Sequence, residues 1–309
     1  MPSIPFDRFR AELLGLYQPP QRARATWTKM RQVLAEVSGL GVRSTRELSP
    51  PLVVRFSNSR PGRNPSTVNG LLSYLRAACA YAVAMRYLSV NPFGVRRFWV
   101  DSDADDLPGP GGRHHPAAAI VRVLRLLESE AGDGSWAAGR LHALVATAAL
   151  TGMRRGEVLG LAVGDVDLPG RLIRVRPNRR RRLKTKKSAR LVPVAEQLAE
   201  VLSRWLPRTG CQWVFPGQTR SGPWLGGGPG LKALDQVKAA GLRAGVDGLT
   251  FLSLRHSWGT HAESLWGLSG PTIQRVMGHT TERTSLDFYR HPDGDNLRLV
   301  GRSIRLEAC

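Results

Sequence analysis

The segment DSDADDLPGPGG, at residues 101–112, limits the possible folds of this chain more than any other stretch. It begins with acidic residues, continues with proline and glycine, and has almost no apolar side chain to bury, which is typical of a linker. With 309 residues the chain is also long enough for two domains. We therefore expect one domain at 1–98, a linker at 99–114 and a second domain at 115–309.

Apolar residues recur at helical spacing on both sides of this segment, as expected for helices that bury one face. In the first domain the pattern covers 26–37 and 67–88, with a polar turn region at 57–66 between them. The Asn91-Pro92-Phe93 triplet is expected to stop the second of these helices. In the second domain the same pattern predicts helices at 116–130, 136–150, 196–206, 231–244, 253–265, 272–277 and 283–289.

Two short runs rich in β-branched residues interrupt the helical pattern of the second domain. RLIRVR at 171–176 and ARLVPV at 189–194 flank the strongly basic segment RRRRLKTKK at 179–187. Strand-like runs on both sides of a turn predict an antiparallel hairpin. The expected fold class is therefore mainly α-helical with a small antiparallel β-sheet.

Charge gives the first indication of a partner. The 45 Lys and Arg residues outnumber the 24 Asp and Glu residues, for a formal net charge of +21. Such an excess fits a polyanionic partner such as a nucleic acid, because each neutralised phosphate releases counterions. A general preference for arginine codons would produce the same excess, so charge alone leaves both explanations open.

Other features limit where the protein acts. No stretch is apolar enough to cross a membrane, and the N-terminal residues do not resemble a secretory signal. The three cysteines are far apart in sequence, which fits a reducing compartment better than a disulfide framework or a zinc cluster. We therefore expect a cytoplasmic protein without membrane association.

Three segments of the second domain carry side chains suited to phosphate chemistry. TGMRRGEVLGL places Arg154 at a tight turn after an apolar helix, where Glu157 could hold the turn by capping or by an ion pair. A Leu-Arg-His triplet places Arg255 near the start of another helix. A Met-Gly-His triplet ends at His279, ten residues before Tyr289. Each segment taken alone is more often an ordinary turn, cap or packing position.

The order of these segments resembles the catalytic domain of the tyrosine recombinase, or phage integrase, family. The resemblance covers residues 116–292, and the N-terminal helices resemble the family's SAM-like core-binding domain more loosely. It implies a two-domain, C-shaped clamp on DNA, and a site-specific recombinase (integrase) of the kind found in mobile elements. Such an enzyme cuts and rejoins DNA through a 3′-phosphotyrosyl intermediate, with no metal, ATP or other cofactor. It also implies a homotetramer assembled on two DNA sites and no small-molecule ligand.

The resemblance also assigns roles residue by residue. Arg154 and Arg255 resemble the arginines that hold the scissile phosphate. Tyr289 resembles the nucleophile, and His279 resembles the histidine that hydrogen-bonds the phosphate. The tail after His291 has apolar residues that suit docking on a neighbouring protomer and folding back on its own domain equally.

The resemblance also indicates which residue is the general acid. A lysine of the hairpin donates a proton to the leaving 5′-oxygen in the family. Lys184 is the choice here, with Lys186 a close second because one sequence does not fix the turn length.

Leu252 stands where the family usually has a histidine, three residues before Arg255. Leucine can neither accept a proton nor bond a phosphate, which leaves tolerated variation and a catalytically impaired DNA-binding relative as alternatives. A type IB topoisomerase-like enzyme is a further alternative, although the short two-domain layout favours a recombinase.

Overall fold

The computed structural model describes residues 3–60, 64–95, 98, 114–178, 189–220, 222–224, 232–278 and 300–307. The chain divides into two compact units, Met1–Leu107 and Pro108–Cys309. Apart from His114, the expected linker lies outside the described residues, so its bounds and those of the two expected domains stay predictions. None of the helices in the described ranges is long and apolar enough to cross a bilayer.

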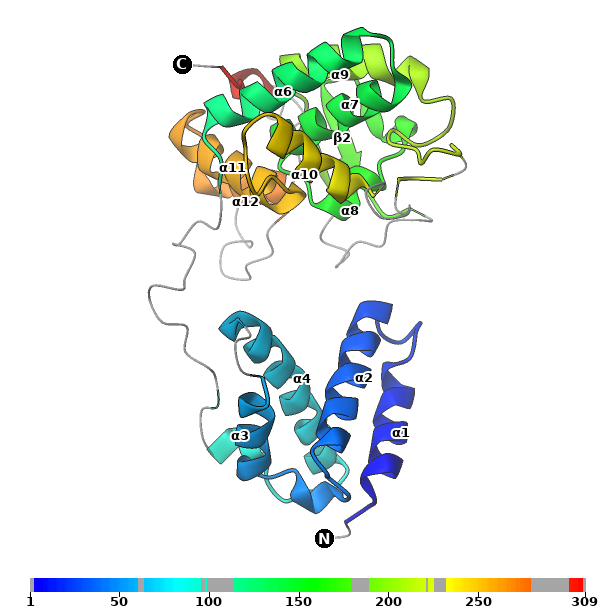
Figure 1. Cartoon of the computed structure of the whole chain (residues 1–309), viewed down its shortest axis with the longest axis vertical. Coiled ribbons are helices and arrows are strands. Elements are labelled where there is room, and N and C mark those ends of the chain that lie inside the picture. Colours follow the sequence, from blue (N-terminus) through cyan, green and yellow to red (C-terminus); the bar gives the residue numbers. More distant parts are fainter. Residues whose placement is uncertain are drawn as a thin grey trace. The chain divides into compact units, whose positions relative to one another are not determined.

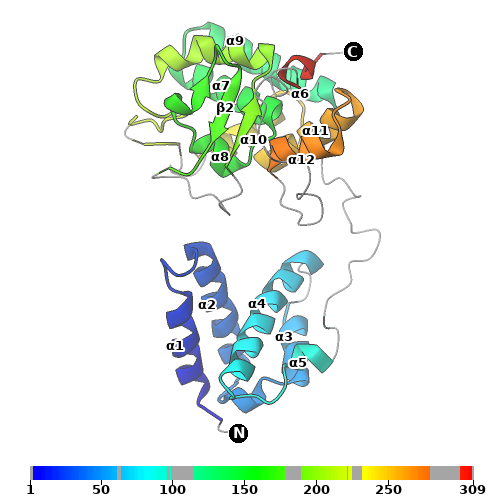
Figure 2. The ribbon, with the colours of Figure 1, turned by 180° about the vertical axis from the view of Figure 1, so that it is seen from behind.

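The first unit is helical. In the two views of Figures 1 and 2, α2 lies between α1 and α4, and α3 lies on the other side of α4. The apolar stripe predicted for the second helix is buried from Val68 to Ala82, where it faces the core of this unit. The helices are α1 (Phe6–Tyr17), α2 (Arg24–Gly39), α3 (Pro50–Asn58), α4 (Pro65–Ala84) and α5 (Pro92–Val95).

Three details of this unit differ from the sequence expectations. The helix α1 was not among the predicted helices. The helix α3 precedes the polar turn region, and it was missed because its nine residues are too few to show a period. The expected helix stop at Asn91-Pro92-Phe93 was wrong, because α4 already ends at Ala84 and Pro92 begins α5 instead. A proline suits the first helical position, where the missing N–H would have no helical partner.

The second unit is built around α7, almost all of which is buried. The helices α6, α9 and α11 pack against it, and α8 follows it directly. In both views α8 and α12 lie at the same end of this unit. Its helices are α6 (Ala117–Gly132), α7 (Trp136–Thr151), α8 (Arg155–Leu159), α9 (Glu196–Trp205), α10 (Ala233–Arg243), α11 (Phe251–Ser264) and α12 (Gly270–Met277).

A small antiparallel sheet completes the second unit and confirms the predicted hairpin. Its strands are β1 (Val166–Asp167), β2 (Leu172–Val175) and β3 (Arg190–Pro193), in the order β1-β2-β3. The register pairs Val175 with Arg190 and Leu172 with Pro193. The strand β1 was not predicted, because two residues carry no alternation. The expected fold class, mainly helical with a small antiparallel sheet, is confirmed.

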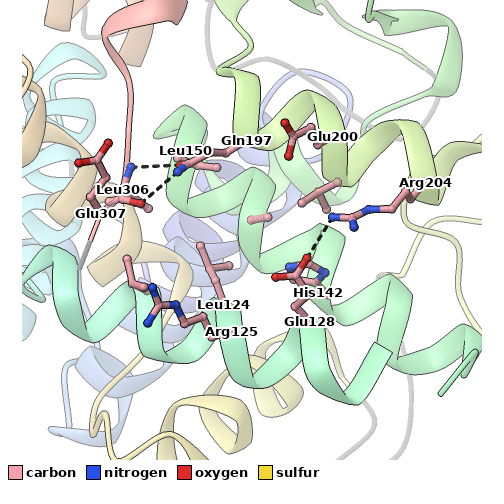
Figure 3. Close-up of a pocket in the computed structure, with 13 residues that line it drawn as sticks. Leu124, Arg125, Glu128, His142, Leu150, Gln197, Glu200, Arg204, Leu306 and Glu307 are labelled. Atoms are coloured by element: carbon pink, nitrogen blue, oxygen red, sulfur yellow. Dashed lines mark hydrogen bonds and ion pairs between the residues drawn. The ribbon is translucent and has the colours of Figure 1, made fainter. Parts of the chain in front are cut away.

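The C-terminal segment at 300–307 packs on its own unit. Ile304 and Leu306 are buried. The side chain of Gln197 on α9 donates to the Leu306 carbonyl at 3.1 Å and accepts from its N–H at 3.1 Å, as Figure 3 shows. A cavity of about 500 Å³ lies beside this contact, between α6, α7 and α9, and neither Arg154 nor Arg255 lines it. Of the two docking modes open from sequence, the described part of the tail adopts the one on its own domain.

Candidate active site

The turn between α7 and α8 fixes the position of Arg154. Gly152 ends α7 in the left-handed conformation, with φ at 60°. A Cβ at this position would lie 2.8 Å from the ring of Trp258, so glycine is required for both the backbone angle and the space. The Trp258 indole in turn donates to the Leu150 carbonyl at 3.1 Å. The Thr-Gly turn is therefore locked by α11, and the chain leaves it at a defined angle.

Arg154 is the residue that precedes α8, and Glu157 holds it in two ways. The backbone N–H of Arg154 donates to Glu157 Oε2 at 2.9 Å, and its Nη1 contacts Oε1 at 3.1 Å. Its Nη2 donates to the carbonyl of Gly278 at 2.7 Å. The side chain is still 38% exposed. The predicted alternatives for Glu157, capping and an ion pair, are both present, and the held guanidinium remains open to a ligand.

Arg255 lies on α11 and reaches the same place from inside the unit. It is 6% exposed. Its Nη1 donates to the Gly152 carbonyl at 2.6 Å and its Nη2 to the Met277 carbonyl at 2.9 Å. Burial lowers the pKa of Arg255 to about 10, the charges of Arg154 and Arg190 add to this, and Glu157 opposes it. The side chain remains protonated at neutral pH, so the site holds concentrated positive charge in surroundings of low polarity.

The C-terminal end of α12 is the element that joins these arginines. The last carbonyls of a helix have no helical partner and carry partial negative charge, which suits cations. The Met277 carbonyl lies 2.9 Å from Arg255 Nη2 and 3.4 Å from Arg154 Nη1. Gly278 ends the helix with φ at 66°. Two arginines distant in sequence therefore meet on one helix end, directly before His279 in the chain.

A third arginine, Arg190, belongs to the same cluster and was missed from sequence. It lies at the start of β3 with a side chain that is 6% exposed. Its Nη1 and Nη2 contact the two carboxylate oxygens of Glu157 at 3.0 and 2.8 Å, and its Nε donates to the Val276 carbonyl at 2.6 Å. One sequence has nothing to separate this arginine from the basic run that precedes it.

The charge state of Glu157 follows from these neighbours. Burial by itself would raise the pKa of Glu157, but the hydrogen bond and charge of Arg190 lower it. The backbone N–H and charge of Arg154 lower it further, so the pKa lies below its ordinary value of 4.5. The carboxylate is therefore ionised at neutral pH, and its negative charge keeps two arginines in fixed positions.

Leu252 lies in the first turn of α11, three residues before Arg255 and on the same side of the helix. Its side chain is 63% exposed. The hydroxyl of Thr250 caps this turn by accepting from the Ser253 N–H at 3.0 Å. The position is thus well ordered but not part of the core, so packing does not require an apolar residue there.

The structure brings together two of the five predicted catalytic residues, Arg154 and Arg255. The other three, Lys184, His279 and Tyr289, lie outside the described residues, as do Lys186 and His291. The catalytic roles of all five stay predictions. What the described residues provide is a cluster of fixed arginines, partly open to solvent, that can bind an anion such as a phosphate.

Comparison with known proteins gives a consistent result. The model described as "Phage integrase family" matches residues 122–295, more than half of the chain. Tyrosine recombinase XerC of Pseudomonas fluorescens strain Pf0-1 is 28% identical over 281 residues, which are 88% of this chain and 82% of that protein.

Two solved structures are similar in fold. The Tn1549 transposon integrase, in complex with a circular intermediate DNA, gives a TM-score of 0.66 at 18% identity and covers 96% of this chain and 98% of that chain. A lambda integrase tetramer bound to a Holliday junction gives a TM-score of 0.64 at 15% identity and covers 92% and 79%.

Proposed function

The chain belongs to the tyrosine recombinase, or phage integrase, family of site-specific recombinases. We therefore propose that it cuts and rejoins double-stranded DNA through a covalent 3′-phosphotyrosyl intermediate at Tyr289. The observation that carries this proposal is the pair Arg154 and Arg255, which share the end of α12. Both are fixed before any ligand binds.

The two arginines would stabilise the transition state at the scissile phosphate. A planar guanidinium can give paired hydrogen bonds to non-bridging oxygens and oppose the extra charge of a pentacovalent phosphorus. Arg154 is the exposed member and would meet the phosphate directly, while Arg255 adds charge from a buried position. Because backbone carbonyls already hold both, little reorganisation is needed when the charge develops.

The remaining steps are assigned to residues matched by the family pattern. The Tyr289 oxygen attacks phosphorus, and the bond from phosphorus to the 5′-oxygen breaks as the new bond forms. Lys184, with Lys186 as the alternative, donates the proton to the leaving 5′-oxygen, and His279 hydrogen-bonds the phosphate. A free tyrosine has a pKa of about 10, so nearby arginine charge would assist its ionisation, and the hydroxyl proton must pass to an acceptor such as solvent water. The covalent bond keeps the phosphodiester energy, so rejoining needs no ATP.

The proposed partner is duplex DNA, bound by a homotetramer on two sites in the cytoplasm. The net charge of +21 supports a polyanionic partner. The structures of related fold support it further, since the Tn1549 integrase was solved with DNA and the lambda integrase as a tetramer on a Holliday junction. The C-shaped clamp expected from the family remains part of this proposal.

A second candidate function rests on Leu252. Its exposed side chain offers no proton acceptor next to Arg255, as expected for a relative that binds DNA and has lost most of its cleavage activity. The arginine cluster argues against this, because a charged cluster with buried members is costly to maintain, and Arg154, Arg190 and Arg255 are all present in it. The recombinase therefore remains the favoured function.

Covalent trapping on DNA tests the proposal. The protein and its Tyr289→Phe variant would be incubated with nicked duplexes from a library of genomic fragments, in EDTA, and adducts isolated under denaturing conditions. The recombinase is expected to form a metal-independent adduct that the variant does not form, while both bind DNA equally. Binding without an adduct on any fragment would favour the impaired relative.

A further inference from the structure

We propose that Arg190 is a positioning residue for DNA cleavage, which holds Arg154 and the end of α12 in one geometry and so sets the cleavage rate rather than the affinity for DNA. This inference rests on the proposed function. Arg190 is not one of the residues assigned by the family pattern, and the argument for it comes from its contacts.

Arg190 is linked to Arg154 in two ways through Glu157. Both terminal nitrogens of Arg190 contact Glu157, one on each oxygen, at 3.0 and 2.8 Å. The same two oxygens hold the backbone and the guanidinium of Arg154. A carboxylate held as a fork has a fixed orientation. Arg190 therefore determines where the two oxygens point, and through them where Arg154 lies.

Arg190 is also linked to the end of α12. Arg190 Nε donates to the Val276 carbonyl at 2.6 Å, and the next two carbonyls along the chain accept from Arg255 and Arg154. A Cβ on Gly278 would lie 2.9 Å from Arg190 Nη1, so the guanidinium packs directly against the backbone at this helix end. One side chain thus fixes both supports of the arginine pair.

The position of Arg190 in the sheet is also defined. It is the first residue of β3 and pairs with Val175 of β2. In sequence it is the third residue after the basic segment that contains Lys184, and it begins the strand that pairs with β2. The cleavage reaction needs both arginines at one phosphate, and Arg190 contacts the two structures that hold them, Glu157 of α8 and the end of α12.

Burial indicates how sensitive this arrangement is. The Arg190 and Glu157 side chains are 6% and 7% exposed, so removal of either weakens the charge compensation of the other inside the protein. A lysine cannot reproduce three contacts from one planar group. Displacement of a catalytic group by about 1 Å lowers a rate on the order of 100-fold.

A neighbouring arginine provides a matched control. Arg174 lies on β2, and its side chain is 53% exposed and faces Asp167 at 3.7 Å. Arg174→Gln removes the same charge from the same sheet as Arg190→Gln. Asp167 does not contact Arg154 among the described contacts. Comparison of Arg174→Gln with Arg190→Gln therefore separates the effect of losing a positive charge from the effect of displacing Arg154.

The experiment compares wild type with Arg190→Gln, Arg190→Lys and Arg174→Gln. Single-turnover adduct formation on a nicked duplex would be measured together with DNA affinity by fluorescence anisotropy. We expect Arg190→Gln to lower the cleavage rate by about 100-fold with DNA affinity within about threefold. Arg190→Lys should lie between it and wild type, and Arg174→Gln should match wild type. An unchanged cleavage rate, or a loss of affinity equal to the loss of rate, would overturn the inference.

A double variant and one further measurement complete the test. If Arg190 acts through Glu157, the Arg190→Gln, Glu157→Gln pair should cleave about as slowly as the slower single variant, and additive losses would contradict this. Amide exchange at Arg154, whose N–H is bonded to Glu157, reads the same link without any cleavage. It should be faster in Arg190→Lys than in Arg174→Gln. If wild type forms no adduct, the proposed function fails, and equal exchange in these two variants would refute the positioning role separately.

Discussion

Buried arginines lie near both ends of α7, and they differ in the side chains that surround them. Near the first end, Arg140 is stacked between the rings of Trp136 and Trp224, at 4.7 and 3.6 Å, and donates to the Pro216 carbonyl at 2.8 Å. Near the other end, Arg255 donates to the Gly152 and Met277 carbonyls. Burial lowers the pKa of each to about 10.

The neighbours of each arginine, and not its burial, distinguish the functional end of α7. Burial and a lowered pKa are common to both arginines, so neither property distinguishes them. Arg140 is enclosed by aromatic rings, which is how a cation stabilises a core. Arg255 is grouped with Arg154 and Arg190 at one helix end, and Arg154 opens this group to solvent. Like charges held close together require a reason, and a phosphate provides one.

The largest expected effect is at Arg255. Arg255→Lys keeps the charge but loses the planar fork that reaches both carbonyls, so we expect adduct formation to fall on the order of 1,000-fold. DNA affinity should change by less than about tenfold, since much of the binding comes from other phosphate contacts. Single-turnover cleavage and anisotropy would measure both. A variant that cleaves at the wild-type rate would remove the distinction between the two ends of α7.

Arg140 provides the reciprocal test. Arg140→Met should lower the free energy of unfolding by about 2 kcal/mol, because it loses two cation–π contacts and one charged hydrogen bond. Cleavage per folded molecule should stay within about threefold. Chemical denaturation and active-site titration would give the two values. If cleavage fell as far as in Arg255→Lys, the cluster at Trp136 would have to be part of the active site.

Leu252 sharpens the comparison within the functional end. Because its side chain is 63% exposed, Leu252→His should fold as well as wild type. We expect the cleavage rate to rise on the order of tenfold, since an imidazole can accept a proton beside the arginine pair. Leu252→Gln is the control for polarity without proton transfer. A rise in both variants, or in neither, would contradict a proton-transfer role at this position.

The smallest effect concerns stability at acid pH. The pKa of Glu157 is lower in the folded protein than its ordinary value of 4.5, so its contribution to stability is present above that value. It is lost as the pH falls from 4.5 through the folded pKa. Urea unfolding at a series of pH values should therefore show a shallower acid decline in Glu157→Gln than in wild type. The same decline in both would mean that Arg154 and Arg190 do not hold the carboxylate ionised.

Several parts of this account were predictable from sequence because they depend on local patterns. The helical periods, the hairpin and the Thr-Gly turn with Glu157 are all properties of neighbouring residues. Arg190 and the α12 carbonyls were not predictable, because their role arises only when β3 packs against α12 and the Arg190 side chain reaches Glu157 on α8. A backbone carbonyl has no sequence signature, and the partners of Arg255 are mostly carbonyls. The short α3 and the role of Pro92 were missed because the first has no full period and the second suits a helix start as well as a stop.

The central claim is that Tyr289 attacks a phosphate held by the arginine cluster, and the most direct test is to locate the covalent bond. The adduct would be digested with trypsin and nuclease, and the modified peptide sequenced by mass spectrometry. Cleavage after Arg283 and Arg290 gives the peptide TSLDFYR. Its side-chain hydroxyl groups belong to Thr284, Ser285 and Tyr289, and Tyr289 is its one tyrosine. The account predicts a 3′-linked nucleotide on Tyr289. A nucleotide on Thr284 or Ser285, or on a different peptide, would contradict it.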